Sequence, residues 1–208
     1  MKILKLVSVA TISALTFGCG SGSSDSKGST SELDGTWVTA CRPDWDRNSN
    51  KSTIEFGSGQ FTVTAHGYPF DDYCVTETEA CTISRPFATG AAVTTPAGAK
   101  EITESPVTKV TLTVKTDGFV SAYNGMQGDP ATCGGGFVKN VAKEVNAAAC
   151  GVEYADAFDT ANRYSIYKID GTKLFIGFDC GEAGTATDCT SAAKRPTTLS
   201  TKFIFTKI

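Results

Sequence analysis

Short runs in which apolar and polar residues alternate are the feature that most restricts how this chain can fold. Val110, Leu112 and Val114 share one face of such a run, and lysines and threonines occupy the other face. A period of two residues is typical of a β-strand that is buried on one face and solvated on the other. Because similar runs recur along most of the chain, the sequence predicts an all-β fold of antiparallel strands.

Two pairs of these runs predict hairpins. Residues 54–56 and 61–65 flank Gly57-Ser58-Gly59, and residues 164–169 and 173–178 flank Asp170-Gly171. Asp-Gly favours a tight turn in which both residues adopt positive φ. With a first run at 37–41 and a last run at 203–208, the chain holds eight or more short strands, which predicts a barrel or a sandwich. The inward positions are expected to be ordinary core: Ile54, Phe56, Phe61, Val110, Leu112, Leu174, Ile176 and Phe203.

The first 18 residues have the pattern of a secretory signal peptide, because two lysines precede an apolar run from Leu6 to Phe17. This run is shorter than the ~20 residues that a spanning helix needs. The next segment is rich in Gly and Ser and has almost no apolar surface, so we expect a flexible tether. The chain therefore divides into a signal peptide (1–18), a tether (19–31) and one globular domain (32–208).

The end of the signal peptide resembles the lipobox of bacterial lipoproteins. In that family a small residue precedes a cysteine that is acylated and becomes the mature N-terminus; Gly18 and Cys19 match, and Thr16 stands where leucine is usual. The resemblance implies lipidation at Cys19 and a membrane-anchored protein of the cell envelope. Gly20, in place of Asp, implies the outer membrane. Two or three acyl chains would anchor the protein stably, whereas one would be marginal.

The charge of the mature chain argues against two kinds of partner. Loss of Lys2 and Lys5 with the signal peptide leaves 17 of the 19 basic residues against 22 acidic ones, a net charge of −5. A mildly acidic surface does not suit nucleic acid or direct contact with anionic lipid headgroups. We therefore expect no nucleic-acid partner and a membrane contact made only through the lipid anchor.

The opening of the globular part, Leu33-Asp34-Gly35-Thr36-Trp37, contains a Gly-x-Trp motif on the first predicted strand. Together with the segments 167–178 and 195–199, it resembles the lipocalin-like domain of bacterial lipoproteins. The resemblance implies an antiparallel up-and-down β-barrel of about eight or more strands with an apolar interior open at one end. Such an interior is either filled by side chains or holds one small ligand.

The resemblance also implies roles for individual residues. Trp37 and Arg195 would form the closed base of the barrel, although lipocalins carry their arginine at the end of the last strand and Arg195 precedes it. Cys41 and Cys74 stand at the positions of two cysteines of the lipocalin-like domain, which implies that they form a disulfide.

The eight cysteines of this exported chain predict further disulfides. Lipidation withdraws one, so at most three bridges can form, and Cys180–Cys189 would close a short loop. Val138, Val141, Ala142 and Val145 recur at helical spacing and predict one short helix near 137–149. This helix is hard to combine with a Cys133–Cys150 bridge. Either the helix is shorter, or Cys133 pairs with Cys81.

Catalytic and metal-binding patterns are scarce. His66 is the only histidine, and the sequence has neither a G-x-S-x-G motif nor a C-x-x-C motif, so we expect no enzyme, no cofactor and no zinc site. His66 is expected at the surface near the end of a strand. The order of oxygen ligands in a calcium loop is matched at Asp44, Asp46, Asn48, Asn50 and Glu55. Ser49 replaces the glycine that this loop needs, so we interpret the segment as a polar connection without metal.

Three hypotheses for function follow, of which the third, an enzyme built on converging carboxylates, has no support from residue spacing. The first is a lipid-anchored binding protein whose barrel takes up a small apolar ligand. The second is a structural or interaction lipoprotein with a solid barrel core, which would contact envelope proteins through its loops, especially 125–150 and 179–194.

Overall fold

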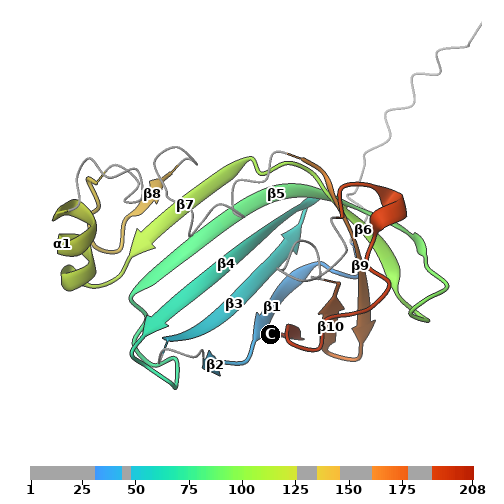
Figure 1. Cartoon of the computed structure of the whole chain (residues 1–208), viewed down its shortest axis with the longest axis horizontal. Coiled ribbons are helices and arrows are strands. Elements are labelled where there is room, and N and C mark those ends of the chain that lie inside the picture. Colours follow the sequence, from blue (N-terminus) through green and yellow to red (C-terminus); the bar gives the residue numbers. More distant parts are fainter. Residues whose placement is uncertain (1–30, 44–47, 126–134, 146–160, 178–188) are drawn as a thin grey trace, which may run out of the picture.

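The computed structural model describes residues 31–43, 48–125, 135–145, 161–177 and 189–208. Within them, eight antiparallel strands close a barrel in which each strand pairs with the next barrel strand along the chain (Figure 1). This confirms the predicted lipocalin-like, all-β fold class. The barrel strands are β1 (Gly35–Thr39), β3 (Asn48–Gly57), β4 (Gln60–Pro69), β5 (Glu79–Ala92), β6 (Lys100–Glu104), β9 (Arg163–Asp170), β10 (Lys173–Ile176) and β11 (Ile204–Lys207).

The predicted hairpins form because their turns and their alternation agree. β3 and β4 are joined by Ser58 and Gly59, which have φ values of 52° and 73°. β9 and β10 also form a hairpin, but the predicted turn is wrong in one detail. Asp170 pairs with Lys173, so the turn residues are Gly171 and Thr172, and only Gly171 has positive φ, at 59°. A glycine with positive φ at the first turn position is typical of the two-residue turns whose backbone twist matches that of the flanking strands.

The wall of the barrel forks along β5. The first half of β5, residues 79–84, pairs with β7 (Lys109–Val114), and the second half, residues 87–92, pairs with β6. Pro86 lies between the two halves, where its missing N–H costs no ladder hydrogen bond. β6 continues into the barrel by pairing with β9, whereas β7 pairs with the short strand β8 (Ala142–Glu144). The part carried by β7 therefore leaves the barrel wall.

A second hydrophobic cluster lies on this diverging part, where the helix α1 (Asp117–Gly125) packs near β7 and β8 (Figure 1). Thr116 begins the helix, because its Oγ1 accepts a hydrogen bond from the N–H of Phe119 at 3.4 Å. Asn124 then binds the backbone N–H and carbonyl of Phe137 at 2.7 and 2.8 Å. Val110 and Leu112, expected inside the barrel core, instead belong to this cluster.

The helix predicted near 137–149 is wrong. Its described part contains a turn and β8, and Asn140 has a φ of 61°, which no α-helix allows. The valines that suggested a helix do not form one buried face, because Val138 and Val141 are exposed and only Val145 is buried. The α-helix of the described part is α1. Among the described residues, none forms a helix long and apolar enough to cross a bilayer.

Candidate functional site

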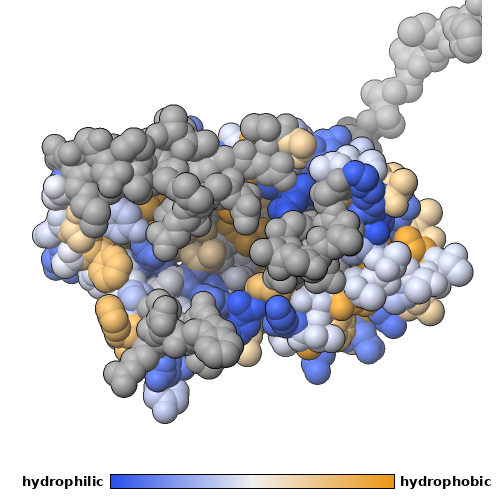
Figure 2. All heavy atoms as spheres, in the orientation of Figure 1, coloured by the Kyte–Doolittle hydropathy of each residue, from blue (hydrophilic) through white to orange (hydrophobic). Residues whose placement is uncertain are grey.

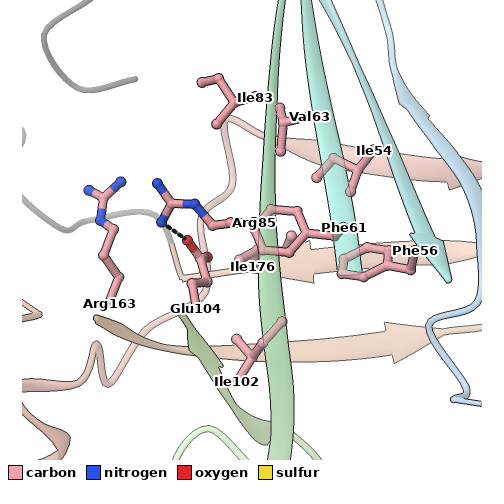
Figure 3. Close-up of a pocket in the computed structure, with 10 residues that line it drawn as sticks. All are labelled: Ile54, Phe56, Phe61, Val63, Ile83, Arg85, Ile102, Glu104, Arg163 and Ile176. Carbon is pink, nitrogen blue, oxygen red and sulfur yellow. Dashed lines mark hydrogen bonds and ion pairs between the residues drawn. The ribbon is translucent and has the colours of Figure 1, made fainter. Parts of the chain in front are cut away.

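A cavity of about 200 Å³ lies inside the barrel (Figure 3). Its walls are mainly apolar, and three charged side chains also line it. Ile54, Phe56, Phe61 and Ile176 had been expected to be core rather than lining, and they line the cavity. The full lining is Ile54, Phe56, Phe61, Val63, Ile83, Arg85, Ile102, Glu104, Arg163 and Ile176.

The apolar wall follows from strand alternation and register. Phe56 on β3 lies opposite Phe61 on β4, and their rings are 5.5 Å apart between centroids. Phe87 on β5 meets both rings edge-on at 5.2 and 6.0 Å. Edge-to-face aromatic contacts at these distances stabilise the wall beyond simple burial. One side of the cavity is therefore a rigid, apolar surface.

The charged side chains lie toward the end of the barrel that is opposite Trp37. Glu104 is the last residue of β6 and Arg163 the first of β9, and the two are register partners. Arg85 Nη1 donates a hydrogen bond to Glu104 Oε2 at 2.8 Å, and the two side chains are only 4% and 14% exposed. Removing charges from water is costly even when they are paired. The Arg85–Glu104 ion pair therefore costs folding free energy where it lies, at the edge of the apolar part of the cavity.

The opposite end of the barrel is closed by the segment before β1. Leu33 is fully buried in the barrel core, and Trp37 Nε1 donates a hydrogen bond to the Leu33 carbonyl at 2.7 Å. Glu32 accepts hydrogen bonds from Tyr167 Oη and Lys100 Nζ, each at 2.8 Å. The Lys100 hydrogen bond lowers the pKa of Glu32, whereas burial and Glu32 raise the pKa of Tyr167. We call residues 31–34 the basal plug.

Trp37 lies at the base as expected, but Arg195 does not cover it. Arg195 Nη1 binds Glu101 Oε1 at 2.7 Å, and its guanidinium lies 5.7 Å from the ring centroid of Tyr164. The cation over Trp37 is Lys207, whose Nζ lies 5.1 Å from the indole centroid. Lys207 is the register partner of Trp37 on the last strand. The base contact predicted for Arg195 is therefore made by a lysine.

The glycine of the Gly-x-Trp motif serves the same contact. Gly35 has a φ of 119°, and a Cβ at this position would approach Lys207 Cε to 3.1 Å. Gly35 thus gives the lysine stem room to reach Trp37.

Of the predicted disulfides, Cys41–Cys74 is confirmed, with Cα atoms 5.8 Å apart. Cys189 is also disulfide-bonded, but Cys180 lies outside the described residues, so Cys180–Cys189 stays a prediction. Cys81 is a buried free thiol, so the alternative in which it pairs with Cys133 is wrong. Cys133 and Cys150 lie outside the described residues, and a bridge between them stays a prediction. Cys19 also lies outside the described residues, and its lipidation stays a prediction.

The residues of the calcium-loop pattern do not converge. Asn48, Asn50 and Glu55 belong to one continuous strand, β3, in which alternation turns the side chains of Asn50 and Glu55 to opposite faces. Asn50 Oδ1 accepts a hydrogen bond from Arg42 Nε at 3.2 Å. Asp44 and Asp46 lie outside the described residues. Within the described ranges, no three His, Cys, Asp or Glu side chains are grouped closely enough to hold a metal ion.

His66 lies within β4 rather than at its end, and it links three segments. Its Nδ1 is 2.8 Å from Glu77 Oε1, and its Nε2 is 3.1 Å from Thr53 Oγ1. These bonds join β3, β4 and the connection to β5. His66 faces away from the cavity, because the inward residues of β4 are Phe61 and Val63.

The connection between β4 and β5 carries a second candidate surface. Phe70, Tyr73 and Val75 are 83%, 83% and 78% exposed. Asp71 fixes the connection, since its carboxylate accepts hydrogen bonds from the backbone N–H groups of residues 73, 75 and 76 at 2.6 to 2.9 Å. These bonds lower the pKa of Asp71. On the face shown in Figure 2, hydrophobic residues are scattered among hydrophilic ones.

The charged residues of the cavity, Arg85, Glu104 and Arg163, were not among the residues predicted from the sequence. The signal was present: Arg85 follows Ile83 and precedes Phe87 at the spacing of one strand face, and Glu104 follows Ile102 in the same way. A charge at an inward position of an apolar strand points to a buried ion pair or to a functional site.

No protein-family model matches the chain, and no curated protein matches its sequence.

Proposed function

We propose that this chain is a lipid-anchored protein of the cell envelope whose barrel binds a small apolar ligand. The observation that supports the binding role is the cavity of about 200 Å³, which is lined by Phe56 and Phe61 on one side and by Ile102 on another. A solid barrel would fill this space with side chains. We further propose that the protein acts by binding rather than by catalysis.

The volume limits the ligand to a small molecule. An apolar cavity of about 150 Å³ stays dry and binds benzene. A space of about 200 Å³ therefore suits one aromatic ring with substituents or an alkyl chain of about six to eight carbons. Larger ligands would require the walls to move apart.

Ligand-observed NMR with toluene and 1-hexanol tests the binding role on the mature chain carrying Cys19→Ser, which cannot be acylated. We expect both probes to bind, and Val63→Phe to abolish binding, because Val63 lines the cavity. Val38→Phe is the matched control, since Val38 lies on the outer face of β1. Equal binding by the two variants, or no binding by the unsubstituted chain, would refute the proposal.

The anchoring role rests on Cys19 and the tether that follows it. Expression in a bacterial host with radiolabelled palmitate should label the full-length chain, and Cys19→Ala should abolish the label. Labelling that persists in Cys19→Ala would contradict the proposed anchor.

The exposed side chains of the β4–β5 connection favour a second candidate, an envelope lipoprotein that contacts another protein. Phe70 and Tyr73 are exposed aromatic residues on either side of Asp71, whose carboxylate binds the backbone of Tyr73 and Val75, and exposed aromatic residues on an ordered connection resemble the anchors of protein interfaces. In-cell crosslinking from Tyr73, replaced by a photoreactive amino acid, should yield one discrete adduct. The same replacement at Thr64, on the outer face of β4, is the control.

A further inference from the structure

We propose that the barrel selects a ligand with an aromatic ring in preference to a saturated ring or a flexible chain. The inference rests on the proposed function, because it specifies the chemical class of the ligand in the same cavity. Three observations support it: the cluster of phenylalanine rings beside the cavity, the stiffness of the other apolar walls, and the volume.

The phenylalanine rings form a cluster that has one side at the cavity. Phe56 and Phe61 stack with an interplanar angle of 29°, and Phe87 meets both rings edge-on at angles of 74° and 77°. Phe56 and Phe61 line the cavity (Figure 3), whereas Phe87 packs behind them and is not part of the lining. A ligand bound there would lie next to two aromatic side chains that are already held in place by ring contacts.

An aromatic ligand gains more from these rings than a saturated ligand of the same size. The face of an aromatic ring carries partial negative charge and its edge carries partial positive charge, so rings attract one another in offset-stacked and edge-to-face arrangements. This attraction adds to the burial of apolar surface, which a saturated ring obtains as well. Phe56 and Phe61 therefore favour an aromatic occupant.

The remaining apolar walls of the cavity are stiff. Every aliphatic side chain of the described lining is branched at Cβ, which restricts rotation about χ1. Methionine, whose flexible side chain adapts to ligands of many shapes, does not occur in this part of the lining. A rigid ring enters such a cavity without losing the rotational freedom that a flexible chain loses on binding. The aliphatic lining residues are Ile54, Val63, Ile83, Ile102 and Ile176.

The volume and the charges of the cavity are compatible with one neutral ring. The cavity of about 200 Å³ is somewhat larger than an apolar cavity of about 150 Å³ that binds benzene, so a ring with a small substituent fits. Arg85, Glu104 and Arg163 also line the cavity, and all three have partners within the protein. These charges therefore do not require a counter-charge from the ligand.

The test compares benzyl alcohol, cyclohexylmethanol and 1-heptanol, which have the same number of carbons and one hydroxyl group each. Association constants are measured by NMR titration on the mature chain with Cys19→Ser. Each constant is divided by the octanol–water partition coefficient of the probe, which removes differences in hydrophobicity. We expect the corrected affinity of benzyl alcohol to exceed that of each saturated probe at least about threefold. A saturated probe that matches or exceeds benzyl alcohol would overturn the inference.

Two variants locate the ring. Phe61→Leu replaces an aromatic lining residue by an aliphatic one, and it should reduce the preference for benzyl alcohol over cyclohexylmethanol at least about twofold. Phe119→Leu is the matched control and should keep the preference, because Phe119 packs against the second hydrophobic cluster and does not line the cavity. An unchanged preference in Phe61→Leu would overturn the inference. If Phe61→Leu does not fold, the comparison of the three probes on the unsubstituted chain decides.

The outcomes separate this inference from the proposed function. Binding of all three alcohols without a preference for benzyl alcohol would leave the apolar binding role standing and remove the aromatic selectivity. Absence of binding by all three probes would remove both.

Discussion

Lys207 illustrates how one side chain can complete a distant motif. Its ammonium group lies over the indole of the buried Trp37, a contact worth about 0.5 to 1 kcal/mol at an accessible site. Lys207→Met should therefore lower the free energy of unfolding by about that amount, and Lys207→Arg should restore it. Urea unfolding followed by tryptophan fluorescence measures the difference, and equal stability of all three proteins would contradict the contact.

Cys81 is predicted to be unreactive while the protein is folded. Burial, with a smaller effect of Glu79, raises the pKa of its thiol to about 11, and the side chain is 7% exposed. Because only the thiolate is nucleophilic, iodoacetamide at mildly alkaline pH should leave Cys81 unmodified in the native protein and alkylate it in denaturant. Peptide mass spectrometry resolves the site; rapid native labelling would contradict the prediction.

For single residues, the sequence predicted burial that follows from alternation within one strand, and it missed contacts that follow from pairing between two strands. The burial of Trp37 follows from alternation within β1. The identity of the cation above it follows from the register between β1 and β11, which brings Lys207 rather than Arg195 to the indole. Register between strands far apart in sequence leaves no local pattern, so only the structure could assign this contact.

Among the elements, the β4–β5 connection depends on the charge of Asp71. The N–H groups of residues 76, 73 and 75 lower the pKa of this carboxylate, so it stays charged in the folded protein below the ordinary pKa of an aspartate. The stability it provides is complete above that ordinary pKa and is lost as the pH falls through the lowered one. The amide NMR signals of Val75 and Thr76 should shift with this transition.

Two variants check the role of Asp71. Asp71→Asn should abolish the transition, because an amide does not titrate; it should also weaken the backbone contacts, because an amide has one acceptor oxygen where the carboxylate uses two. Asp72→Asn, one residue along the chain, should leave the titration of both amide signals unchanged. A transition that survives in Asp71→Asn would assign it to another group.

The Cys41–Cys74 disulfide ties the end of β1 to the β4–β5 connection. The bridge spans 33 residues of sequence, for which the chain-entropy model gives about 3 to 4 kcal/mol of stabilisation. The double variant Cys41→Ala/Cys74→Ala should lose that amount in urea unfolding and retain its β-sheet circular dichroism. A loss below about 1 kcal/mol would show that the unfolded chain is not restricted by this bridge.

Helices and strands whose own residues carry a turn or cap pattern were predictable. The strand that pairs only because β5 is divided between β6 and β7 was not. Both hairpins follow from alternation flanking a turn. The helix α1 had a usable signal, since Thr116 and Asp117 begin it and Gly125 ends it. The strand β8 had none: its three residues pair with β7 only because β5 is shared between two neighbours. Valine spacing alone therefore suggested a helix there.

For the molecule as a whole, the basal plug is predicted to support the entire barrel. Leu33 is fully buried and its carbonyl binds the indole of Trp37. Leu33→Ala should lower the free energy of unfolding by about 2 to 5 kcal/mol, as expected for a core leucine, whereas Leu33→Met should cost less than about 1.5 kcal/mol. Urea unfolding measures both, and a loss below about 1 kcal/mol for Leu33→Ala would show that the plug is dispensable.

The class of architecture was predictable because many short strands in one domain have few ways to bury their faces. The cavity was not predictable. Ile54 and Phe56 show the inward pattern of a filled core, and their sequence spacing does not reveal whether opposite walls meet. Closure of the ring by β1 and β11 sets that distance, and it depends on all the strands together.

The position of the basal plug has a consequence for delivery. The chain enters the barrel at the end closed by the basal plug, while Glu104 and Arg163 lie toward the opposite end. If Cys19 is acylated as proposed, the flexible tether would join the domain at its plugged end, and the opposite end would be able to turn toward the aqueous compartment. A ligand or partner at that end would then be met on the aqueous side of the membrane rather than within the bilayer.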